Sequence, residues 1–592
     1  MKKSIKNILW TALAGVAAVS CFNLDETPYD RVDQSVYYQN EGSVKGAVAA
    51  AYNEPTRAIQ YFYFLNEFPA DQITWRVWNG GQWGWDEAEK FVLSSHTWTA
   101  ESKIIRDAWN NTWTTIGLTN NIIADLEAIS PASIGMTEEK IASYIAEVRT
   151  LRAWSYYKLF EVWGGALPLN TTVGSDVPPS VSEDFDEGCR IIWKFIADEL
   201  DGTVGALPQN SQNRMNQAMN RLLKARLLIN AGVFIGEDHF SECATLCQDI
   251  IDGKYGTYSL VDDFREIFGK DNDNCREIIY ATAMDINYSN FDAHNYRHMA
   301  YAYNAWNGFG FTTDASGWNC TCLVPSHDNS EGDGMTVGKG KSFLDAPYND
   351  KLGAPYERLD DRDIRKQAYY CSPSGEWNGG IFLIGPQYEY GTDIPLKADA
   401  DREEGNYDLV YVDQVGTFQN LGKNLETVMS PRWGETNSGY RLVKYAVYPD
   451  AVGWDYRNTD EVEFRLAEAY YMLAECKLRS GDSAGAKELV DQVRGRYFTA
   501  SERSAALSVP GPGFSEFNLD WMLSEWGKEF IGEGQRRRTD LRRFDKFTQG
   551  QWWFFGRTDE GYEAKRDRKY EWYPLPSVAL TVNPGLVQNP NY

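Results

Sequence analysis

The sequence predicts an all-α protein in which packed pairs of helices support long loops and a few small β-hairpins. Two observations predict the helices: apolar residues recur at helical spacing from Thr137 to Trp163, and a helix-turn-helix pattern follows near 460–496. A third observation concerns residues 255–457, which are rich in Gly, Asn, Asp and Tyr and contain only short apolar runs, as long loops do. A chain of 592 residues has room for a large core.

Residues 1–20 have the pattern of a secretory signal peptide. Three lysines precede an apolar run over 8–19, which is too short to span a bilayer. Cys21 follows directly, and a cysteine there resembles the site where a bacterial lipoprotein is cleaved and acylated. Asp25-Glu26 resembles the export signal for the outer face of the outer membrane. We therefore expect a surface-exposed outer-membrane lipoprotein whose only anchor is the lipid on Cys21.

The composition restricts the class of ligand. The chain has a net charge of −26, which would repel nucleic acid and anionic membrane surfaces and suits a neutral ligand such as a sugar. Nine cysteines form neither a disulfide framework nor a zinc-binding spacing. The spacing of Cys320 and Cys322 leaves a local disulfide between them open.

Helices are predicted in chain order from periodicity and from residues that end helices. In the clearest case, Glu138 and Glu139 suit the first turn and Gly164-Gly165 ends the helix. The predicted helical segments are 30–52, 101–129, 137–163, 185–201, 216–234, 239–252 and 517–531.

A further helix pair is predicted over 461–496. Asp460 can cap it with Glu463 three residues on, and small residues such as Ala474 and Gly481 follow at roughly the spacing of a tetratricopeptide repeat. Such pairs bury their apolar faces by stacking, so we expect this one to dock on the N-terminal helices.

These patterns divide the chain into five parts. They are a signal peptide (1–20), an N-terminal helical scaffold with a Trp-rich loop at 71–86 (21–254), a loop-rich insertion (255–457), a helix pair completing the scaffold (458–500) and a C-terminal segment (501–592).

Tryptophan is unusually dense near the N-terminus. The residues are Trp75, Trp78, Trp83, Trp85 and Trp98. Packing in the core is one interpretation and a surface binding platform is the other. The irregular spacing and the Gly80-Gly81 break favour a loop that cannot all be core. The loop-rich insertion contains a second aromatic patch, with Tyr296, Tyr301, Trp306 and Trp318.

Aromatic rings suit sugars because a sugar ring has a C–H face and a rim of hydroxyls. Indole offers a flat apolar surface with little rotamer entropy to lose, and by analogy with base stacking each ring contributes about 1–3 kcal/mol. Asn319 supplies a hydrogen-bonding partner beside Trp318. The predicted ligand-binding residues are Trp75, Trp78, Trp83, Trp85, Tyr296, Tyr301, Trp306, Trp318 and Asn319.

No motif selects a catalytic site. The chain has 84 acidic residues, so pairs of carboxylates arise by chance, and neither His-Glu-x-x-His nor Gly-x-Ser-x-Gly occurs. We expect no enzyme and no cofactor. The 271–274 segment, Asp-Asn-Asp-Asn, could donate oxygens to a structural calcium ion, although a solvated turn explains it as well. The Arg-rich run 536–543 is interleaved with acids and is expected to form internal ion pairs.

Five blocks spread along the chain resemble one family signature. They are Cys21 with Leu24-Asp25 and Pro28, Leu151-Arg152-Ala153 through Leu169, Arg465-Leu466-Ala467-Glu468 through Glu475, Glu529-Phe530 with Glu533-Gly534 and Arg537 through Phe544, and Tyr573-Pro574-Leu575-Pro576 with Asn583 through Tyr592. Together they resemble the RagB/SusD family of outer-membrane lipoproteins.

The resemblance implies a scaffold of four tetratricopeptide-like helix pairs, with loops that form the ligand platform. It also implies a partner, because such proteins cover a SusC-type TonB-dependent transporter and deliver glycan to it. In the branch that includes the starch-binding prototype, ligand lies against an arc of rings. The matching candidates here are Trp83 and Trp85 with their neighbours, and Trp318 with Tyr296, Tyr301 or Trp306. Trp98 and Trp109 match structural segments and are expected to pack internally.

We therefore expect a glycan-binding surface lipoprotein. A peptide-capturing member of the same family is the alternative, and a purely structural surface module is a third reading. The platform hypothesis makes a geometric demand: the stretch that begins at Trp75 and the stretch near Trp318 must face the same side of the folded helices.

Overall fold

The computed structural model describes most of the chain after the predicted signal peptide. The described residues are 37–76, 89–174, 177–285, 287–288, 295–302, 304–311, 317–327, 342, 344, 352–398, 408–413, 436–449, 458–550, 557–558, 561–562 and 567–592. The predicted lipidation site, Cys21, lies outside them. Among the described residues, no helix is both long and apolar enough to cross a membrane.

Helices make up most of the regular structure. The N-terminal ones are α3 (Glu41–Asn53), α4 (Ile59–Glu67), α5 (Phe91–Ser94), α6 (Lys103–Ala128), α7 (Glu138–Trp163), α8 (Phe185–Thr203), α9 (Gln217–Ile229), α10 (Ala231–Phe234) and α11 (Phe240–Ile251). The later ones are α12 (Arg265–Phe268), α13 (Asn295–His298), α14 (Ala305–Phe309), α16 (Leu466–Arg479), α17 (Ser483–Arg494), α18 (Arg503–Leu507), α19 (Leu519–Glu529), α20 (Arg537–Arg543) and α21 (Ser577–Val582).

The described strands are short and form two-stranded sheets. They are β1 (Ile73–Trp75), β2 (Ile278–Thr282), β3 (Thr321–Leu323), β4 (Phe382–Leu383), β5 (Gly385–Pro386), β6 (Val410–Tyr411), β7 (Arg441–Leu442), β8 (Glu461–Arg465), β9 (Arg557–Thr558) and β10 (Gly561–Tyr562). The pairs are β1–β3, β2–β8, β4–β7, β5–β6 and β9–β10. The predicted all-α class with small hairpins is thus confirmed.

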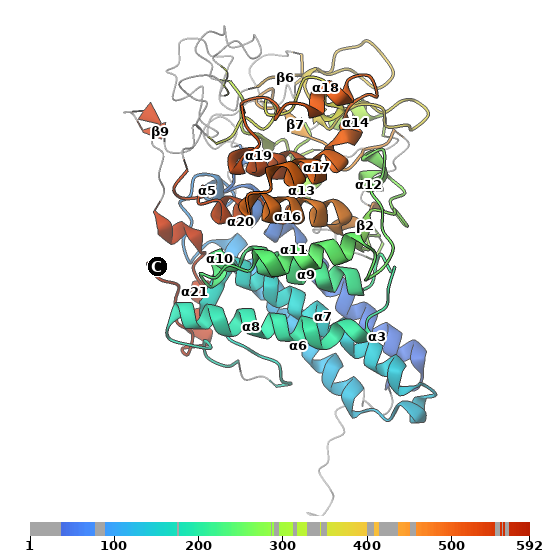
Figure 1. The fold of residues 1–592 in the computed structure, drawn as a ribbon, viewed down its shortest axis with the longest axis vertical. Coiled ribbons are helices and arrows are strands. Elements are labelled where there is room, and N and C mark those ends of the chain that lie inside the picture. The colour runs from blue at the N-terminus through green and yellow to red at the C-terminus, as the bar shows by residue number, and fades with distance from the viewer. Residues whose placement is uncertain are drawn as a thin grey trace, which may run out of the picture.

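The helices stack in one continuous series. Neighbouring pairs are α6 with α7, α7 with α8, α9 with α11, α11 with α16, and α16 with α17 and α19. Figure 1 shows α16 lying directly above α11 and α9, with the loop-rich region and α14 at the top. The prediction that the late helix pair docks on the N-terminal helices is confirmed, because α16 packs against α11 despite more than two hundred intervening residues.

Two local predictions are wrong. Residues 461–465 form strand β8 instead of the first helical turn, since all five are buried and pair antiparallel with β2. Asp460 is consequently no helix cap. Its carboxylate accepts hydrogen bonds from the backbone N–H of Met284 (2.9 Å) and from Asn213 (2.7 Å). Helix α4 was not predicted, because eight of its nine residues are buried and a helix that is buried all round shows no amphipathic period.

A buried cluster of charges joins the loop-rich region to the stacked helices. The Glu529 carboxylate at the end of α19 accepts hydrogen bonds from Arg465 (2.7 Å), Arg496 (2.7 Å) and Tyr497 (2.9 Å). Arg365, from the loop-rich region, approaches it at 3.4 Å. Burial alone would raise the pKa of Glu529, but the surrounding arginines hold it well below its usual range.

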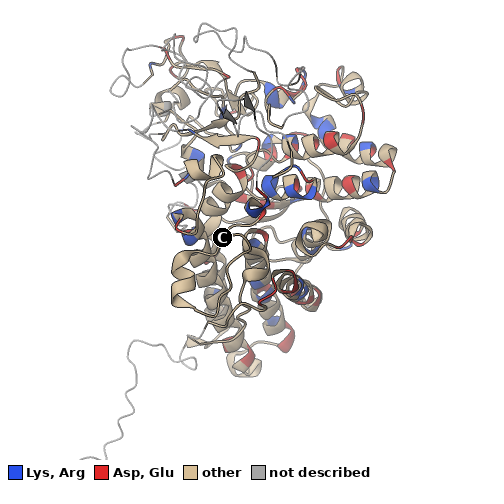
Figure 2. Ribbon diagram, turned by 90° about the vertical axis from the view of Figure 1, so that its left-hand side faces the viewer, with Lys and Arg blue, Asp and Glu red and all other residues tan. Residues whose placement is uncertain are grey.

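The Arg-rich run of α20 forms internal ion pairs, as predicted. Arg536 pairs with Glu468 at 2.8 Å, Arg537 with Asp71 at 2.7 Å and Arg543 with Glu475 at 2.8 Å. Figure 2 shows basic and acidic segments beside one another on the helices in the middle of the molecule. These pairs tie the C-terminal segment to both the N-terminal loop at Asp71 and helix α16.

A second carboxylate, Glu67 at the end of α4, holds the turn after α19. Its Oε1 accepts a hydrogen bond from the N–H of Gly534 at 2.9 Å. Gly534 has φ +72°, and a Cβ there would lie 2.7 Å from the Tyr63 ring, so only glycine fits this contact. Burial raises the pKa of Glu67 to about 7. The hydrogen bond from Gly534 and the positive charge of Arg537 lower the pKa, but by less than burial raises it.

We predict that Glu529→Gln lowers the free energy of unfolding by roughly 3–5 kcal/mol, because it leaves buried arginines without their shared counter-charge. Urea denaturation of the purified protein measures this. Asp198→Asn is the matched control, since its partner Lys194 and Asp198 itself are largely exposed and such a pair is worth about 0–1 kcal/mol. Equal effects of the two substitutions would contradict the proposed role of the cluster.

We also predict that Glu67→Gln changes how stability depends on pH. The folded pKa of about 7 exceeds the ordinary value of 4.5, so the native state binds the proton more readily and ionisation of Glu67 costs stability as pH rises through 7. The variant should exceed the parent by on the order of 1–3 kcal/mol at pH 8, with the difference vanishing near pH 4.5. Urea midpoints at several pH values test this, and a difference independent of pH would refute it.

Candidate functional site

Strands β1 and β3 bring the two aromatic stretches together. They pair antiparallel, with Trp75 opposite Thr321, although almost 250 residues separate them in the chain. The stretch that begins at Trp75 therefore lies beside the segment that contains Trp318. The described ends of the two stretches are thus neighbours, and that their rings face the same side of the helices stays a prediction. The rings of Trp78, Trp83 and Trp85 lie outside the described residues and stay predictions.

Two buried arginines hold this seam in place around Asn319. Arg441 donates to the Asn319 Oδ1 (2.9 Å) and to the carbonyl of Thr321 (2.8 Å), while the guanidinium of Arg76 donates to the Asn319 carbonyl. Asn319 has φ +55° and is 6% exposed. We therefore correct its assignment as a ligand-binding residue: its side-chain oxygen is already used to fix the seam.

Trp75 is also corrected to a structural role. Its side chain is fully buried beneath the seam, and its ring packs against Phe68 with centroids 5.7 Å apart. The Lys90 ammonium lies 4.7 Å from the ring centroid on the indole face. The backbone N–H of Trp75 donates a hydrogen bond to Ser94 Oγ at 2.9 Å. No face of this indole is left for a sugar.

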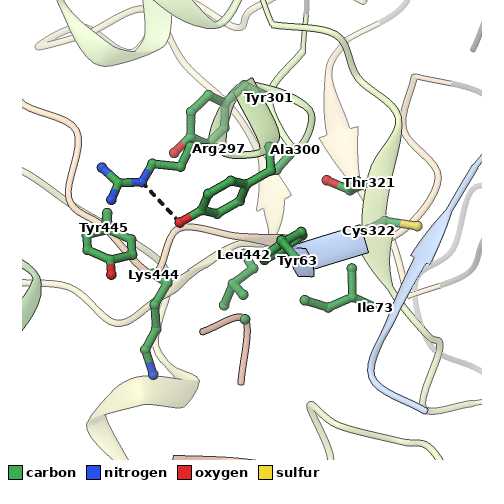
Figure 3. Close-up of a pocket in the computed structure, with 12 residues that line it drawn as sticks. Tyr63, Ile73, Arg297, Ala300, Tyr301, Thr321, Cys322, Leu442, Lys444 and Tyr445 are labelled. Carbon is green, nitrogen blue, oxygen red and sulfur yellow. Dashed lines mark hydrogen bonds between the residues drawn. The ribbon is translucent and has the colours of Figure 1, made fainter. Parts of the chain in front are cut away.

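Tyr296 and Tyr301 both line a small internal cavity below the seam. Figure 3 shows Tyr301 with Tyr63 and Arg297 around it. The Tyr296 hydroxyl donates to Glu461 at 2.6 Å, and its ring stacks on Tyr63 at 4.2 Å. Tyr301 packs edge-on against Phe309 at 5.0 Å. The cavity of about 30 Å³ has room for about one water and not for a sugar. Both tyrosines are buried supports, which corrects their assignment as ligand-binding residues.

Trp306 and Trp318 remain candidates for contact with a ligand. Both are half-buried and rest on the core, so part of each residue reaches the surface. Trp318 is placed by its backbone N–H, which donates to the carbonyl of His298 at the end of α13 (3.1 Å). Trp306 lies on α14, which ends at Gly310 in a left-handed conformation. By contrast, Trp98 and Trp109 are buried, as expected.

An open cavity of about 520 Å³ borders the far end of α14. Gly308 and Phe309 of α14 form one side of it, and strands β4, β5 and β6 with their loops form the rest. At its rim, Tyr370 is 55% exposed and Tyr388 is 47% exposed. Its volume falls within the roughly 300–1,000 Å³ typical of small-molecule sites.

The walls of this cavity combine rings with polar groups. Tyr369, Tyr390 and Tyr411 add further rings, and Gln387, Glu389, Thr392 and Asp393 also line it. A tight turn orders the polar rim, because the Glu389 N–H donates to Ile394 O (2.9 Å) and Thr392 Oγ1 donates to Glu389 O (3.0 Å). The Tyr411 hydroxyl accepts from the N–H of Ala302 (3.2 Å), which links the cavity to the seam.

No sequence motif singles out Tyr370 or Tyr388. They belong to the loop-rich insertion, where tyrosine and glycine recur without the period of a helix or strand. The only signal was compositional, in the run Tyr388-Glu389-Tyr390-Gly391. Exposure of an aromatic ring depends on how the loops close over α14, and no local pattern encodes that.

The described residues contain no cluster of three or more His, Cys, Asp or Glu side chains suited to a metal ion. In the Asp-Asn-Asp-Asn segment, the amide oxygen of Asn272 accepts from the Asp460 N–H (3.1 Å), so it braces the fold. Calcium at Asp271 and Asp273 stays an untested prediction. Cys320 and Cys322 form no disulfide, and the Cys320 thiol donates to the carbonyl of Trp318.

The chain is similar in sequence and in fold to known proteins. The chain is 24% identical over 543 residues to the starch-binding protein SusD of Bacteroides thetaiotaomicron, which covers 89% of this chain and 84% of the relative. It is 22% identical over 604 residues to SusD-like protein P25 of Formosa agariphila, covering 96% of each. The fold is similar to that of surface glycan-binding protein A from Bacteroides uniformis, with a TM-score of 0.61 and 17% identity over 93% of this chain and 99% of the other.

A family model described as the SusD family matches residues 276–592. This span is more than half of the chain and includes most of the loop-rich insertion, the late helix pair and the C-terminal segment. The protein belongs to the SusD family.

Proposed function

We propose that this protein is a cell-surface lipoprotein that captures an oligosaccharide or polysaccharide and delivers it to a SusC-type TonB-dependent transporter. The observation that carries the proposal is the open, tyrosine-lined cavity next to the β1–β3 seam. Membership of the SusD family supports it, as do relatives named for binding starch and surface glycan.

The cavity meets both demands that a sugar makes on a binding site. Exposed faces of Tyr370 and Tyr388 offer apolar surfaces for the C–H side of a ring, while Glu389 and Asp393 offer acceptors for hydroxyl groups. Trp306, on the same helix α14, and Trp318, in the segment before β3, are further half-buried rings. A few stacks of about 1–3 kcal/mol each give micromolar to millimolar affinity, which suits capture followed by release.

Charge favours a neutral glycan over other polymers. The chain carries a net charge of −26, and the acidic groups Glu389 and Asp393 line the cavity itself. A polyanion such as nucleic acid would be repelled both at long range and at the site. We propose that capture involves no chemical reaction, in keeping with relatives that are named as binding proteins.

The remaining parts of the proposal concern location. We propose that Cys21 is acylated, that the lipid holds the protein on the outer face of the outer membrane, and that the loop-rich end presents glycan to the transporter. The resemblance of the N-terminal sequence to a lipoprotein signal supports this arrangement.

We predict that Tyr370→Ala and Tyr388→Ala each weaken glycan binding by about 1–3 kcal/mol, and that Trp318→Ala acts in the same direction. Affinity electrophoresis through gels containing starch, laminarin, xylan, mannan or galactan measures retention. Tyr255→Ala is the matched control, because this partly exposed tyrosine does not line the cavity. Binding of peptides with no retention by any polysaccharide would refute glycan capture and favour the peptide-capturing alternative.

We predict that Cys21→Ala moves the protein out of the membrane fraction and abolishes incorporation of labelled palmitate, because the lipid is the proposed anchor. Fractionation of cells expressing either form, followed by immunoblotting, measures this. Co-purification of a TonB-dependent transporter with the acylated form would support the proposed partner. Retention of the variant in the outer membrane would show that another anchor exists.

A further inference from the structure

A second open cavity lies beside α3, at the lower right of Figure 1, whereas the loops around α14 are at the top. Its volume is about 780 Å³, again within the range of small-molecule sites. One wall is the exposed side of α3, another is Tyr144 of α7 with Arg214 before α9, and the third is the segment that follows β2. None of these elements takes part in the site described above.

The most prominent feature of this cavity is Tyr288. Its side chain is 81% exposed, the highest value among the large apolar side chains of the described residues. Two hydrogen bonds connect its segment to Asp285: the Tyr288 N–H donates to Asp285 O (3.0 Å) and the Asn287 N–H donates to Asp285 Oδ1 (2.7 Å). An exposed aromatic ring is a surface on which another flat apolar face can stack.

Arg214 provides an oriented donor opposite this ring. Its Nε donates to the fully buried Glu147 at 3.0 Å, and its guanidinium lies 5.7 Å from the centroid of Tyr144. Its side chain nevertheless keeps 45% of its surface exposed, and its Nη1 has no acceptor within the described part of the chain. The Glu147 contact fixes the guanidinium before any ligand arrives, so little side-chain entropy remains to be lost on binding.

The shape of the cavity depends on small residues and on a brace. Gly46, Ala49 and Ala50 occupy the exposed side of α3, and their size leaves the groove open. On the other side, the buried Asp460 binds both Asn213 and Met284, which fixes two parts of the wall relative to each other. The cavity is therefore preformed and does not need to open for a ligand.

The chemistry around the cavity selects a neutral, hydroxyl-rich ligand with a flat apolar face. Lys45 pairs with Glu41 at 3.0 Å and Arg214 pairs with Glu147, so both cations at the cavity already have a counter-charge and a strong anion is not favoured. Asn53, exposed at the end of α3, adds an amide that can both donate and accept. A stacking ring with hydrogen-bonding groups around its edge is what a pyranose or furanose unit requires.

We propose that the α3 cavity is a second glycan-binding site, which takes a short segment of the captured polysaccharide by stacking on Tyr288 and hydrogen bonding to Arg214. The inference rests on the proposed function, because it assumes that this protein binds glycan. It adds a location that the loop-rich site does not require.

Two independent substitutions test the proposal. Tyr288→Ala removes the stacking surface, and Ala49→Trp fills the groove from the exposed side of α3 without touching the core. Both are placed in full-length protein that also carries Tyr370→Ala and Tyr388→Ala, so that the loop-rich site is weakened. The probes are gels of starch, laminarin, xylan, mannan and galactan, Tyr255→Ala is the control, and thermal unfolding confirms that each variant folds.

The expected result is residual retention in the Tyr370→Ala, Tyr388→Ala background that falls roughly 5- to 150-fold in affinity when either cavity substitution is added. Unchanged retention with both Tyr288→Ala and Ala49→Trp would overturn the second site and leave the proposed function standing. Complete loss of retention in the background variant alone would do the same. Failure of the unmodified protein to bind any of the polysaccharides would overturn both proposals.

Discussion

The carboxylate of Glu529 is the interaction on which the arrangement of the molecule depends. It ends α19, and three arginines reach it: Arg465 from the start of α16, Arg496 from the end of the α16–α17 pair and Arg365 from the loop-rich region. Removing one partner from a buried ionic cluster strongly destabilises the fold because the remaining charges stay buried without their counter-charge. A shift of the loop-rich region relative to the helices would therefore expose or strand these charges, which favours a fixed junction between the two parts.

Rigidity at this junction matters for a site made of loops. The seam between β1 and β3 is held by Arg441 and Asn319, and β7, which carries Arg441, pairs with β4 at the wall of the loop-rich cavity. Each hydrogen-bonded step thus connects the buried charge cluster to the exposed tyrosines. Weak stacking can yield useful affinity only when the rings are already held in place. Ordering each side chain on binding would otherwise cancel much of the binding free energy from stacking.

The sequence predicts the scaffold better than it predicts the site. Helix α7 was predicted to within one residue at its start, because acidic residues begin it and a glycine pair ends it. Helix α4 carries no such signal, since burial on every side removes the amphipathic pattern, and strand β8 was taken for helix because its pairing partner, β2, lies far away in the sequence.

Aromatic side chains explain why the site was harder to predict. Tyrosine and tryptophan serve equally well in a core and on a sugar-binding surface, so their density locates an important region without showing which rings are exposed. The two aromatic stretches singled out in the sequence are neighbours in the fold, yet Trp75 and Tyr296 are buried there, while Tyr370 and Tyr388 reach solvent. Long-range packing decides which rings are buried and which are exposed, and the sequence next to each ring does not indicate the outcome.

Two weak sites on one rigid body would act differently on long and short ligands. If both the loop-rich cavity and the α3 cavity bind glycan, a polysaccharide long enough to reach both gains from the effective concentration created by the first contact, whereas a short oligosaccharide does not. Affinity would then grow with chain length beyond the span of a single cavity. Such a protein retains polymer strongly at the cell surface and releases fragments easily, which is the order of events that uptake through a transporter requires.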